Sequence, residues 1–499
     1  MRVDLATTWG ALEAGAEVST SRTVAAGAAW LYGAQAIVVV FQFGYAALTS
    51  RIVSPEGFGA YGAALATMAL VALLATGGLA PVMSRMAEID AGRVRAVALA
   101  SGGLGLVAMA TLLVGAPAAA AVWGIADAVP PIRTTAAIVV VLPFSAVAMA
   151  LARRAGRFRR LAVLTAGAGV CGLAVGAVVV AHYRTADSLL VAQITTQWII
   201  AIGAAVSERR HLFGRPDLRH FRRDIGFSNR VTVSKVISYA SGVLPKIVGS
   251  STFGASLLGQ WNRAEVVSSV PLQQVLTAFQ QALYPEFRHD IDDNRRARRV
   301  WTDLLGMLAW LVLPAGAWLI GTLPVVVPVL FGGGWELAVV IAQVLVLYSA
   351  MQLVNVVLST ALEALGWFTV LWTGQTTVLV IVAVTSGVSA WTGTWWVLLV
   401  GPPLSIVIQH GIYTAAAAKR GYLDSKTLAR SYWGAGAVAL VVWGGVASVT
   451  AAGHDAAPGV RFALACAVLL LAAGAAWLTR RRLPPYQVAM RYGLLSRPK

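Results

Sequence analysis

Charged residues are scarce in this chain. Asp, Glu, Lys and Arg make up 12% of its 499 residues, while hydrophobic residues make up 58%. A soluble globular protein carries about 25% charged residues, and half that share leaves too little polar surface to keep so long a chain in water. The scarcity of charge therefore excludes a soluble globular protein and predicts one that is embedded in a membrane.

The chain also has only two cysteines, Cys171 and Cys466, and each lies inside an apolar run far from the other. A disulfide framework or a zinc site needs more cysteines at characteristic spacing, so we predict neither, and no metal site. The phosphate-loop pattern Gly-x-x-x-x-Gly-Lys-Ser/Thr is missing as well. We therefore expect no ATP hydrolysis and no cofactor, and leave open whether an ion drives the chain.

The hydrophobic residues are grouped in runs of about 20, the length at which an α-helix crosses about 30 Å of hydrocarbon. Breaks at Gly, Pro or charged residues separate fourteen such runs, which predict an all-α polytopic membrane protein. We expect transmembrane helices near residues 25–49, 60–84, 96–122, 132–152, 161–181, 188–206, 231–250, 263–283, 301–323, 336–358, 367–389, 394–416, 433–452 and 459–478.

The distribution of the basic residues predicts the orientation of these helices. An even number of spans places both termini on one side, and cytoplasmic segments of membrane proteins carry an excess of Lys and Arg. If both termini are cytoplasmic, nearly all of the 39 Lys and Arg residues fall in cytoplasmic segments. The exceptions are Arg51, Arg133, Arg184, Lys246, Arg263 and Arg461. The net charge of +18 thus indicates topology in an inner membrane rather than binding to nucleic acid.

The longest cytoplasmic segment is basic and follows the sixth span, so it predicts a division into two six-helix lobes followed by two additional helices. We expect a cytoplasmic N-terminal tail at 1–24, an N-terminal lobe at 25–206, a cytoplasmic linker at 207–230, a C-terminal lobe at 231–416, the two additional helices at 417–478 and a basic cytoplasmic tail at 479–499.

The two lobes carry a similar short sequence at the same place. Phe58-Gly59-Ala60-Tyr61 and Leu258-Gly259-Gln260-Trp261 share an apolar-Gly-x-aromatic pattern, 200 positions apart. Each stretch lies at the outer end of the first hairpin of its lobe. The pattern predicts parallel repeats related by an axis along the membrane normal, an arrangement known from transporters that rock around a central site.

The stretch from Arg51 to Tyr61 resembles the polysaccharide transporter (Wzx-type) family of the multidrug/oligosaccharidyl-lipid/polysaccharide exporter superfamily. In this family an Arg-apolar-apolar-Ser/Gly-Pro-acidic-aromatic-Gly-x-Tyr stretch follows the first span, and this chain departs from it by Gly57 between Glu56 and Phe58. A Phe-Gly…Trp element before the tenth span, here Phe331 to Trp335, is also similar to the family.

This resemblance implies two lobes around a cavity that opens alternately to each side. It also implies a flippase rather than an enzyme, whose cargo is an oligosaccharide on undecaprenyl diphosphate. The partners would be this glycolipid and membrane lipids, and contact with a glycosyltransferase or polymerase of the same pathway stays open.

Four predicted spans carry polar residues that cannot all face lipid. Lys235 and Lys246 are eleven residues apart, about three helical turns, and so share one face. An unpaired cation at the bilayer centre costs about 2.5–3.5 kcal/mol, so we expect such helices to line a hydrated cavity. Amides and hydroxyls suit sugars, and cations suit a diphosphate. The predicted cargo-binding residues are Lys235, Lys246, Tyr239, Arg263, Gln273, Thr277, Gln280, Gln35, Gln42, Gln352 and Asn355.

Structural explanations stay open for the same residues. The two lysines could extend to the membrane surface, Arg263 could pair with Glu265, and the glutamines could join helices by hydrogen bonds. In the tenth span Tyr348, Gln352, Asn355 and Ser359 follow at spacings of four, three and four residues, which favours one polar stripe. A structural or gating loop is predicted at Arg51, Pro55, Glu56 and Gly59.

Three other functions compete with this hypothesis. An ion-coupled multidrug exporter of the same superfamily has twelve spans as a rule, whereas we expect fourteen. The peptidoglycan lipid-precursor flippase shares fourteen spans, but its Asp-Ala-Phe and Pro-Asn motifs are missing here. A membrane glycosyltransferase or polymerase needs catalytic residues in a large outer loop, and the short outer loops here hold few acids and no Asp-x-Asp pair.

Overall fold

The chain folds mainly into long apolar helices. The computed structural model describes residues 33, 37–76, 90–217, 221–269, 294–453 and 455–491. Every regular element among these residues is a helix, and eleven helical segments are long and apolar enough to cross a membrane. The chain is therefore an all-helical, multi-pass membrane protein.

The eleven segments coincide with eleven of the fourteen predicted spans. They are α2 (Pro55–Thr76), α4 (Ala91–Trp123), the broken segment Ala126–Arg154, α8 (Phe158–Tyr183), α9 (Ala186–Ser207), α14 (Asn294–Phe331), α15 (Glu336–Ala364), α16 (Phe368–Thr392), α17 (Val397–Lys419), α18 (Ser425–Ala452) and α19 (Pro458–Leu478).

The other three predicted spans, the first, seventh and eighth, are not among these eleven segments. The first is described mainly as the apolar helix Ile37–Ser50. The seventh lies within α11 (Phe221–Phe253), and the eighth begins in α12 (Ala255–Ser268) and continues beyond the described residues. The total of fourteen spans and the cytoplasmic position of both termini stay predictions.

The fourth predicted span differs from the single helix expected at 132–152. It consists of the 3-10 turn η1 (Ala126–Ala128) and three consecutive helices, α5 (Val129–Thr134), α6 (Ala136–Val139) and α7 (Leu142–Arg154). Prolines begin α5 and α7. Proline lacks the backbone N–H and has a fixed φ angle. It is therefore favoured in the first turn of a helix and prevents the preceding helix from continuing through it.

The contacts within the chain divide it into two compact units. Unit 1 comprises residues 1–53, 63–121 and 126–236, and unit 2 comprises residues 54–62, 122–125 and 237–499. The segment 207–230, which we expected as a linker, contains α10 (Arg209–Leu212) and the start of α11. The boundary between the units therefore falls inside α11, after Val236.

Small residues allow close helix packing in unit 1. A Cβ atom added at Gly176 of α8 would lie 2.5 Å from the Cβ atom of Ala192 of α9, and one at Gly172 would meet the hydroxyl group of Thr196. That hydroxyl donates a hydrogen bond to the carbonyl of Ala168 across the two helices. This pairing of small residues with a hydroxyl is typical of membrane helices, where apolar burial gives no net drive to associate.

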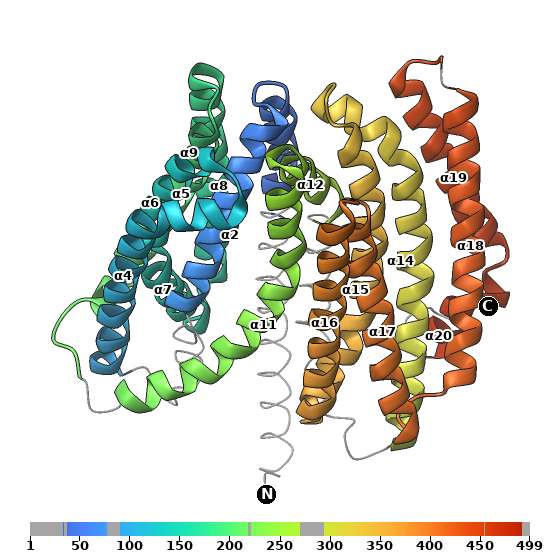
Figure 1. Ribbon diagram of the computed structural model, residues 1–499. Helices are drawn as coiled ribbons and strands as arrows, with labels where there is room; N and C mark the ends of the chain where they lie inside the picture. The colour runs from blue at the N-terminus through green and yellow to red at the C-terminus, as the bar shows by residue number, and fades with distance from the viewer. Residues whose placement is uncertain are drawn as a thin grey trace, which may run out of the picture. The chain divides into compact units, whose positions relative to one another are not determined.

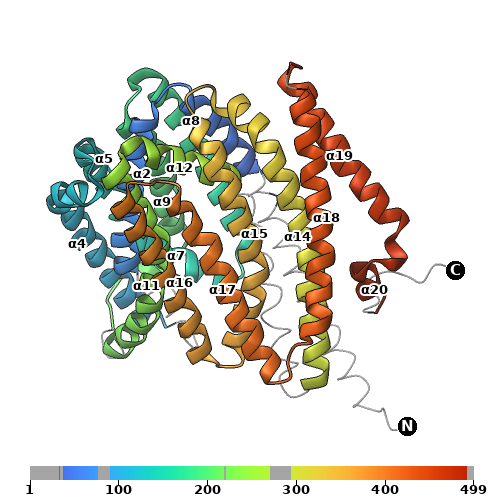
Figure 2. The same cartoon turned by 45° about the vertical axis from the view of Figure 1, so that its right-hand side comes forward.

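In unit 2, α18 runs along α14, and α19 lies against both (Figure 1, Figure 2). The indole N–H of Trp318 on α14 donates to the carbonyl oxygen of Ala465 on α19 at 2.9 Å. Gly321 on α14 approaches Val446 on α18 so closely that an added Cβ atom would lie 2.7 Å from its side chain. The last two helices are thus an integral part of unit 2.

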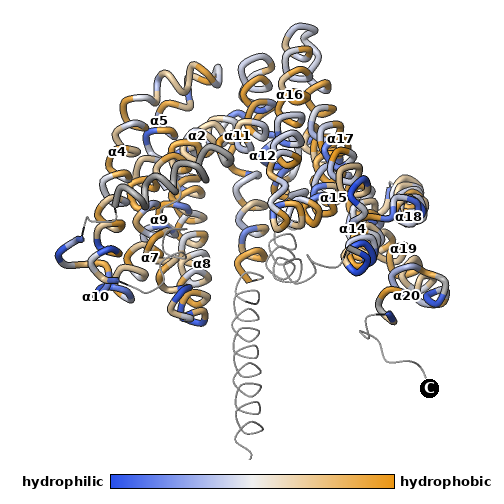
Figure 3. Tube along the Cα trace, turned by 90° about the horizontal axis from the view of Figure 1, so that it is seen from below, coloured by the Kyte–Doolittle hydropathy of each residue, from blue (hydrophilic) through white to orange (hydrophobic). Residues whose placement is uncertain are grey.

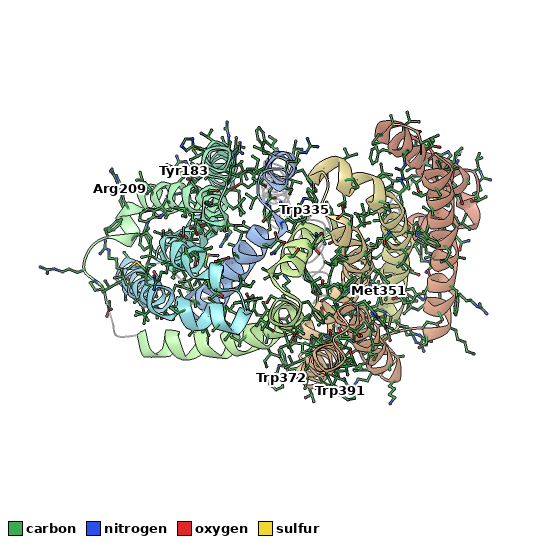
Figure 4. All side chains as sticks on the ribbon, turned by 45° about the horizontal axis from the view of Figure 1, so that its top comes forward. Tyr183, Arg209, Trp335, Met351, Trp372 and Trp391 are labelled. Atoms are coloured by element: carbon green, nitrogen blue, oxygen red, sulfur yellow. The ribbon has the colours of Figure 1, made fainter. Side chains whose placement is uncertain are left out.

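The outer surfaces of the helices are apolar. Figure 3 shows hydrophobic colour along their lengths and hydrophilic colour mainly at ends such as α10 and the beginning of α14. Trp372 and Trp391 on α16, labelled in Figure 4, are 61% and 87% exposed. Exposure of such large apolar groups is expected where lipid, and not water, covers the surface.

Candidate functional site

A polar cavity of about 310 Å³ in unit 2 is lined by residues of α11, α12, α15, α16 and α17. This volume is at the lower end of the range for small-molecule sites. Ten of its lining residues carry uncharged hydrogen-bonding groups. They are Ser238, Ser241, Tyr348, Gln352, Asn355, Ser359, Gln375, Ser405, Gln409 and Tyr413. The indole of Trp261 and the carboxylate of Glu265 line it as well.

The polar stripe predicted on the tenth span forms one wall of this cavity. Tyr348, Gln352, Asn355 and Ser359 all lie on α15 and all line the cavity. Spacings of four, three and four residues place side chains on one face of a helix, and the opposite face of α15 is apolar. Local periodicity was therefore sufficient to predict this wall.

A chain of hydrogen bonds fixes the amides and the phenol at one end of the cavity. Asn355 donates through Nδ2 to Oε1 of Gln409 at 2.8 Å, and Gln409 donates through Nε2 to the hydroxyl of Tyr413 at 3.2 Å. The Tyr413 hydroxyl in turn donates to the carbonyl oxygen of Leu371 on α16 at 3.2 Å. These bonds join α15, α16 and α17 and set the orientation of the polar lining.

The chain of bonds continues behind the cavity wall to α18. His410 is buried, with 6% of its surface exposed. Its Nδ1 lies 3.3 Å from Oδ1 of Asn355, and its Nε2 lies 2.9 Å from the hydroxyl of Tyr432. Asn355 is therefore held from two sides, and the imidazole links the cavity to one of the two additional helices.

The ammonium group of Lys246 is paired with the carboxylate of Glu265. Lys246 Nζ lies 2.7 Å from Oε1 and 2.8 Å from Oε2 of Glu265, and the indole N–H of Trp261 donates to Oε1 at 3.2 Å. Gly254, at a φ angle of +92°, separates α11 from α12, a conformation that glycine adopts readily. The turn brings the lysine and the carboxylate together and neutralises both charges at the cavity.

Arg263 is not among the residues that line the cavity, and of the alternatives left open for it, the pair with Glu265 is not formed. The side chain is buried, with 6% exposed, and its guanidinium carbon lies 3.8 Å from the ring centre of Phe58 and 5.8 Å from that of Phe331. Both contacts are within the range of cation–π attraction. Arg263 thus takes part in an aromatic cluster that the two family-like stretches form together.

Of the predicted loop residues, Pro55, Glu56 and Gly59 lie in the first turns of α2, and Pro55 and Gly59 approach α12 closely. Ser54 precedes the helix, and its hydroxyl accepts a hydrogen bond from the backbone N–H of Gly57 at 3.3 Å. Pro55 and Glu56 occupy the first turn, where proline and an acidic residue are favoured. Arg51 and Glu56 are exposed, and a gating role for this loop stays a prediction.

Two further predicted cargo-binding residues, Tyr239 and Gln42, are described and do not line this cavity. Tyr239 is half-buried on α11 beside it, and Gln42 is exposed on the helix Ile37–Ser50 of unit 1. The residues Gln35, Gln273, Thr277 and Gln280 lie outside the described residues, as does the side chain of Lys235. Their roles stay predictions.

The contributions of α16 and α17 to the cavity were not predicted from the sequence. Gln409 and Tyr413 are four residues apart on α17, and this spacing indicates one face of a helix, as it does on α15. Gln375 is the only amide of α16 and lies among Thr373, Thr376 and Thr377, so the polar residues there do not single out one face.

The apolar helices and the polar cavity together define the class of this protein, a multi-pass membrane protein with a polar cavity between its helices. The family described as polysaccharide biosynthesis protein matches residues 48–340. The chain therefore belongs to this family, and the resemblance noted in the sequence is confirmed.

Two relatives share part of the chain. The lipopolysaccharide biosynthesis protein WzxC of Escherichia coli (strain K12) is 25% identical over 352 residues, which are 66% of this chain and 67% of the relative. The succinoglycan biosynthesis transport protein ExoT of Rhizobium meliloti (strain 1021) is 25% identical over 297 residues, 58% of this chain. This chain spans 59% of the length of ExoT.

Solved structures share the fold at low sequence identity. The lipid II flippase MurJ in an inward closed conformation matches with a TM-score of 0.71 and 11% identity, covering 90% of this chain and 99% of that one. An inward-facing multidrug resistance transporter of the MATE family matches with a TM-score of 0.52 and 14% identity, over 77% and 95% of the two chains. These matches show the fold alone.

Proposed function

We propose that this chain is a flippase that carries an undecaprenyl-diphosphate-linked oligosaccharide, a repeat unit of a cell-surface polysaccharide, across the cytoplasmic membrane. The observation that carries the proposal is the cavity of unit 2, where ten uncharged hydrogen-bonding side chains surround about 310 Å³. Polar side chains inside a membrane are expensive and mark the path of a polar cargo. The family to which the chain belongs agrees with a glycan cargo.

The mechanism in this proposal is alternating access. The sugar headgroup enters the cavity from one side of the membrane while the polyprenyl tail stays in the lipid. A change in the arrangement of the helices then opens the cavity to the other side. The names of the relatives, a lipopolysaccharide biosynthesis protein and a succinoglycan transport protein, support transport of glycans in this family. A coupling ion and contacts with biosynthetic enzymes are left open.

A second candidate is export of small cationic drugs, because multidrug transporters share the fold. A carboxylate that is free to pair with the drug is the simplest way to hold a cation in such a cavity. Within the described lining of the cavity Glu265 is the only carboxylate, and Lys246 neutralises it. The charge distribution of the cavity therefore favours the glycan over the drug.

Deletion of the gene in its own host tests the proposal. We expect surface polysaccharide to be lost and lipid-linked repeat units to accumulate, and the wild-type gene to restore export. The variant Thr392→Ala, changed at the exposed end of α16, should restore export equally. Normal polysaccharide in the deletion strain, together with higher sensitivity to cationic drugs, would instead establish the second candidate.

A further inference from the structure

The cavity of unit 2 holds polar groups but almost no net charge. Of its described lining residues, Glu265 alone is ionisable at neutral pH, and Lys246 and the indole N–H of Trp261 bind its carboxylate. A diphosphate is held in proteins by Arg, Lys or several backbone N–H groups that face it. The described lining offers no cation that is available for such a contact.

The same lining matches the hydrogen-bonding pattern of a sugar. Each sugar hydroxyl both donates and accepts, and amide and hydroxyl side chains do the same. Gln352 and Gln375, on α15 and α16, make no side-chain hydrogen bond within the part of the chain that is described. Two amides are thus ready to bond a ligand, while Asn355 and Gln409 are held in place by their neighbours.

Trp261 on α12 contributes an aromatic ring to the lining of the cavity. Trp261 lines the cavity and is buried, with 4% of its surface exposed. Its N–H is fixed by Glu265 at 3.2 Å, so the ring is oriented before any ligand arrives. A rigid ring beside fixed amides reduces the entropy lost on binding.

We infer that this cavity is a subsite for an uncharged sugar unit of the cargo, and that the diphosphate stays outside it. The inference rests on the proposed function and makes it more specific. It replaces the cationic cargo site that we expected around Lys246 by a neutral one. Because Lys246 is paired with Glu265, its charge is not available to attract a diphosphate into the cavity.

Protection of a cysteine from alkylation tests the inference on the purified chain. Val378→Cys, at an apolar lining residue of α16 that leaves both amides in place, is introduced after Cys171 and Cys466, which are both free, are replaced by serine. N-ethylmaleimide labelling is followed with a panel of neutral methyl glycosides, or inorganic pyrophosphate, as the probe. A glycoside at ten times its dissociation constant should slow labelling about tenfold, and pyrophosphate should have no effect. Thr392→Cys is the control that no probe should protect.

Protection by pyrophosphate but by no glycoside would overturn the inference, and so would the absence of any protection. Glu265→Gln in the same background gives a second, independent measurement. It removes the charge that neutralises Lys246, so pyrophosphate should now slow the labelling of Val378→Cys. If pyrophosphate still has no effect, the role given to this ion pair is wrong.

These measurements are independent of the proposed function. They report on what enters the cavity, whereas the gene deletion reports on export from the cell. Protection by glycosides in a chain whose deletion leaves export intact would refute the flippase and keep the sugar site. Loss of export without glycoside protection would keep the flippase and refute the subsite.

Discussion

Gly59 and Gly259 occupy equivalent places in the two repeats, and each packs against the residue four positions before the other. A methyl group on Gly59 would collide with the carbonyl oxygen of Ala255, and one on Gly259 with that of Pro55. Between them, Gly62 faces Asn262, which stands 200 positions later. Equivalent residues that exchange contacts in this way are the mark of a two-fold axis. The pattern noticed in the sequence therefore has a physical cause, a close crossing that both repeats build.

Replacement of either glycine should destabilise this crossing. We expect Gly59→Ala and Gly259→Ala each to lower the free energy of unfolding by about 1–3 kcal/mol, the usual effect of overpacking. Thermal unfolding in detergent measures the change. Gly474→Ala on α19, where an added Cβ atom meets nothing within 4 Å, is the control and should not destabilise. Unchanged unfolding of both crossing variants would show that the backbones do not approach this closely.

The ion pair of Lys246 and Glu265 should behave as a unit. Lys246→Met leaves the carboxylate of Glu265 without its partner, and Glu265→Gln leaves the ammonium group of Lys246 without its partner. The Glu265 side chain is 32% exposed and the Lys246 side chain 18%. Loss of one partner at a partly buried site is more harmful than loss of both. We expect the double variant to be more stable than the sum of the single effects predicts by about 0.5–3 kcal/mol. Additive effects in thermal unfolding would contradict the pairing.

Gln352 and Gln375 should contribute to transport more than to stability. Each offers an amide to the cavity, and a neutral hydrogen bond contributes about 0.5–1.5 kcal/mol, so alanine at either site should lower the rate of glycan export by up to about tenfold. The rate is followed as flipping of lipid-linked oligosaccharide in proteoliposomes. The matched control is Thr373→Val on α16, whose hydroxyl is exposed and bonds only within its own helix. Equal rates for all three variants would remove the amides from the cargo path.

The tyrosine behind the cavity should be needed for stability. Tyr432→Phe removes the hydroxyl that bonds Nε2 of buried His410. A buried polar atom left without its partner costs about 1–3 kcal/mol, so the variant should unfold at lower temperature. Tyr183→Phe, at a tyrosine that is 65% exposed and is labelled in Figure 4, should have no effect. Equal unfolding temperatures would mean that this hydrogen bond contributes nothing.

Periodicity within one helix was predictable, and pairing between helices was not. The stripe of Tyr348, Gln352 and Asn355 follows from spacing alone, because one helix fixes it. A pair of Arg263 with Glu265 was one alternative that the sequence left open, but residues two apart on a helix face different directions. The partner of Glu265 is Lys246, 19 positions before it. Only the turn at Gly254 brings the two together, and no local pattern encodes the direction of that turn.

The interruption of the fourth span by proline was not predicted. Pro130, Pro131 and Pro143 are visible in the sequence, yet the apolar run is long enough for one helix and was predicted as one. The length of an apolar run predicts whether a segment can cross the membrane. Proline predicts where the helix within that segment is interrupted, because it lacks the backbone N–H. The apolar run and the prolines are both present in the sequence, and the span was predicted from the apolar run alone.

Asp424 should stabilise the start of α18 in a pH-dependent way. Its carboxylate accepts hydrogen bonds from the backbone N–H groups of Lys426 and Thr427 at 3.1 and 3.3 Å. These bonds, chiefly the one from Thr427, hold the pKa of Asp424 below its ordinary value. A pKa lowered in the folded state gives stability that is full above the unfolded pKa and is lost as the pH falls through the folded one.

We therefore expect Asp424→Ala to lower the free energy of unfolding at neutral pH by about 1 kcal/mol, the usual effect of losing a helix cap. The difference from the wild type should shrink as the pH falls below about 3.9, the ordinary value for aspartate, and through the lowered pKa, down to the smaller value that a neutral carboxyl cap gives. Asp424→Asn is the control, since asparagine caps a helix about as well and does not titrate. Thermal unfolding as a function of pH measures all three chains. A difference between wild type and Asp424→Ala that stays constant down to pH values below the lowered pKa would show that the carboxylate charge is not what stabilises the helix.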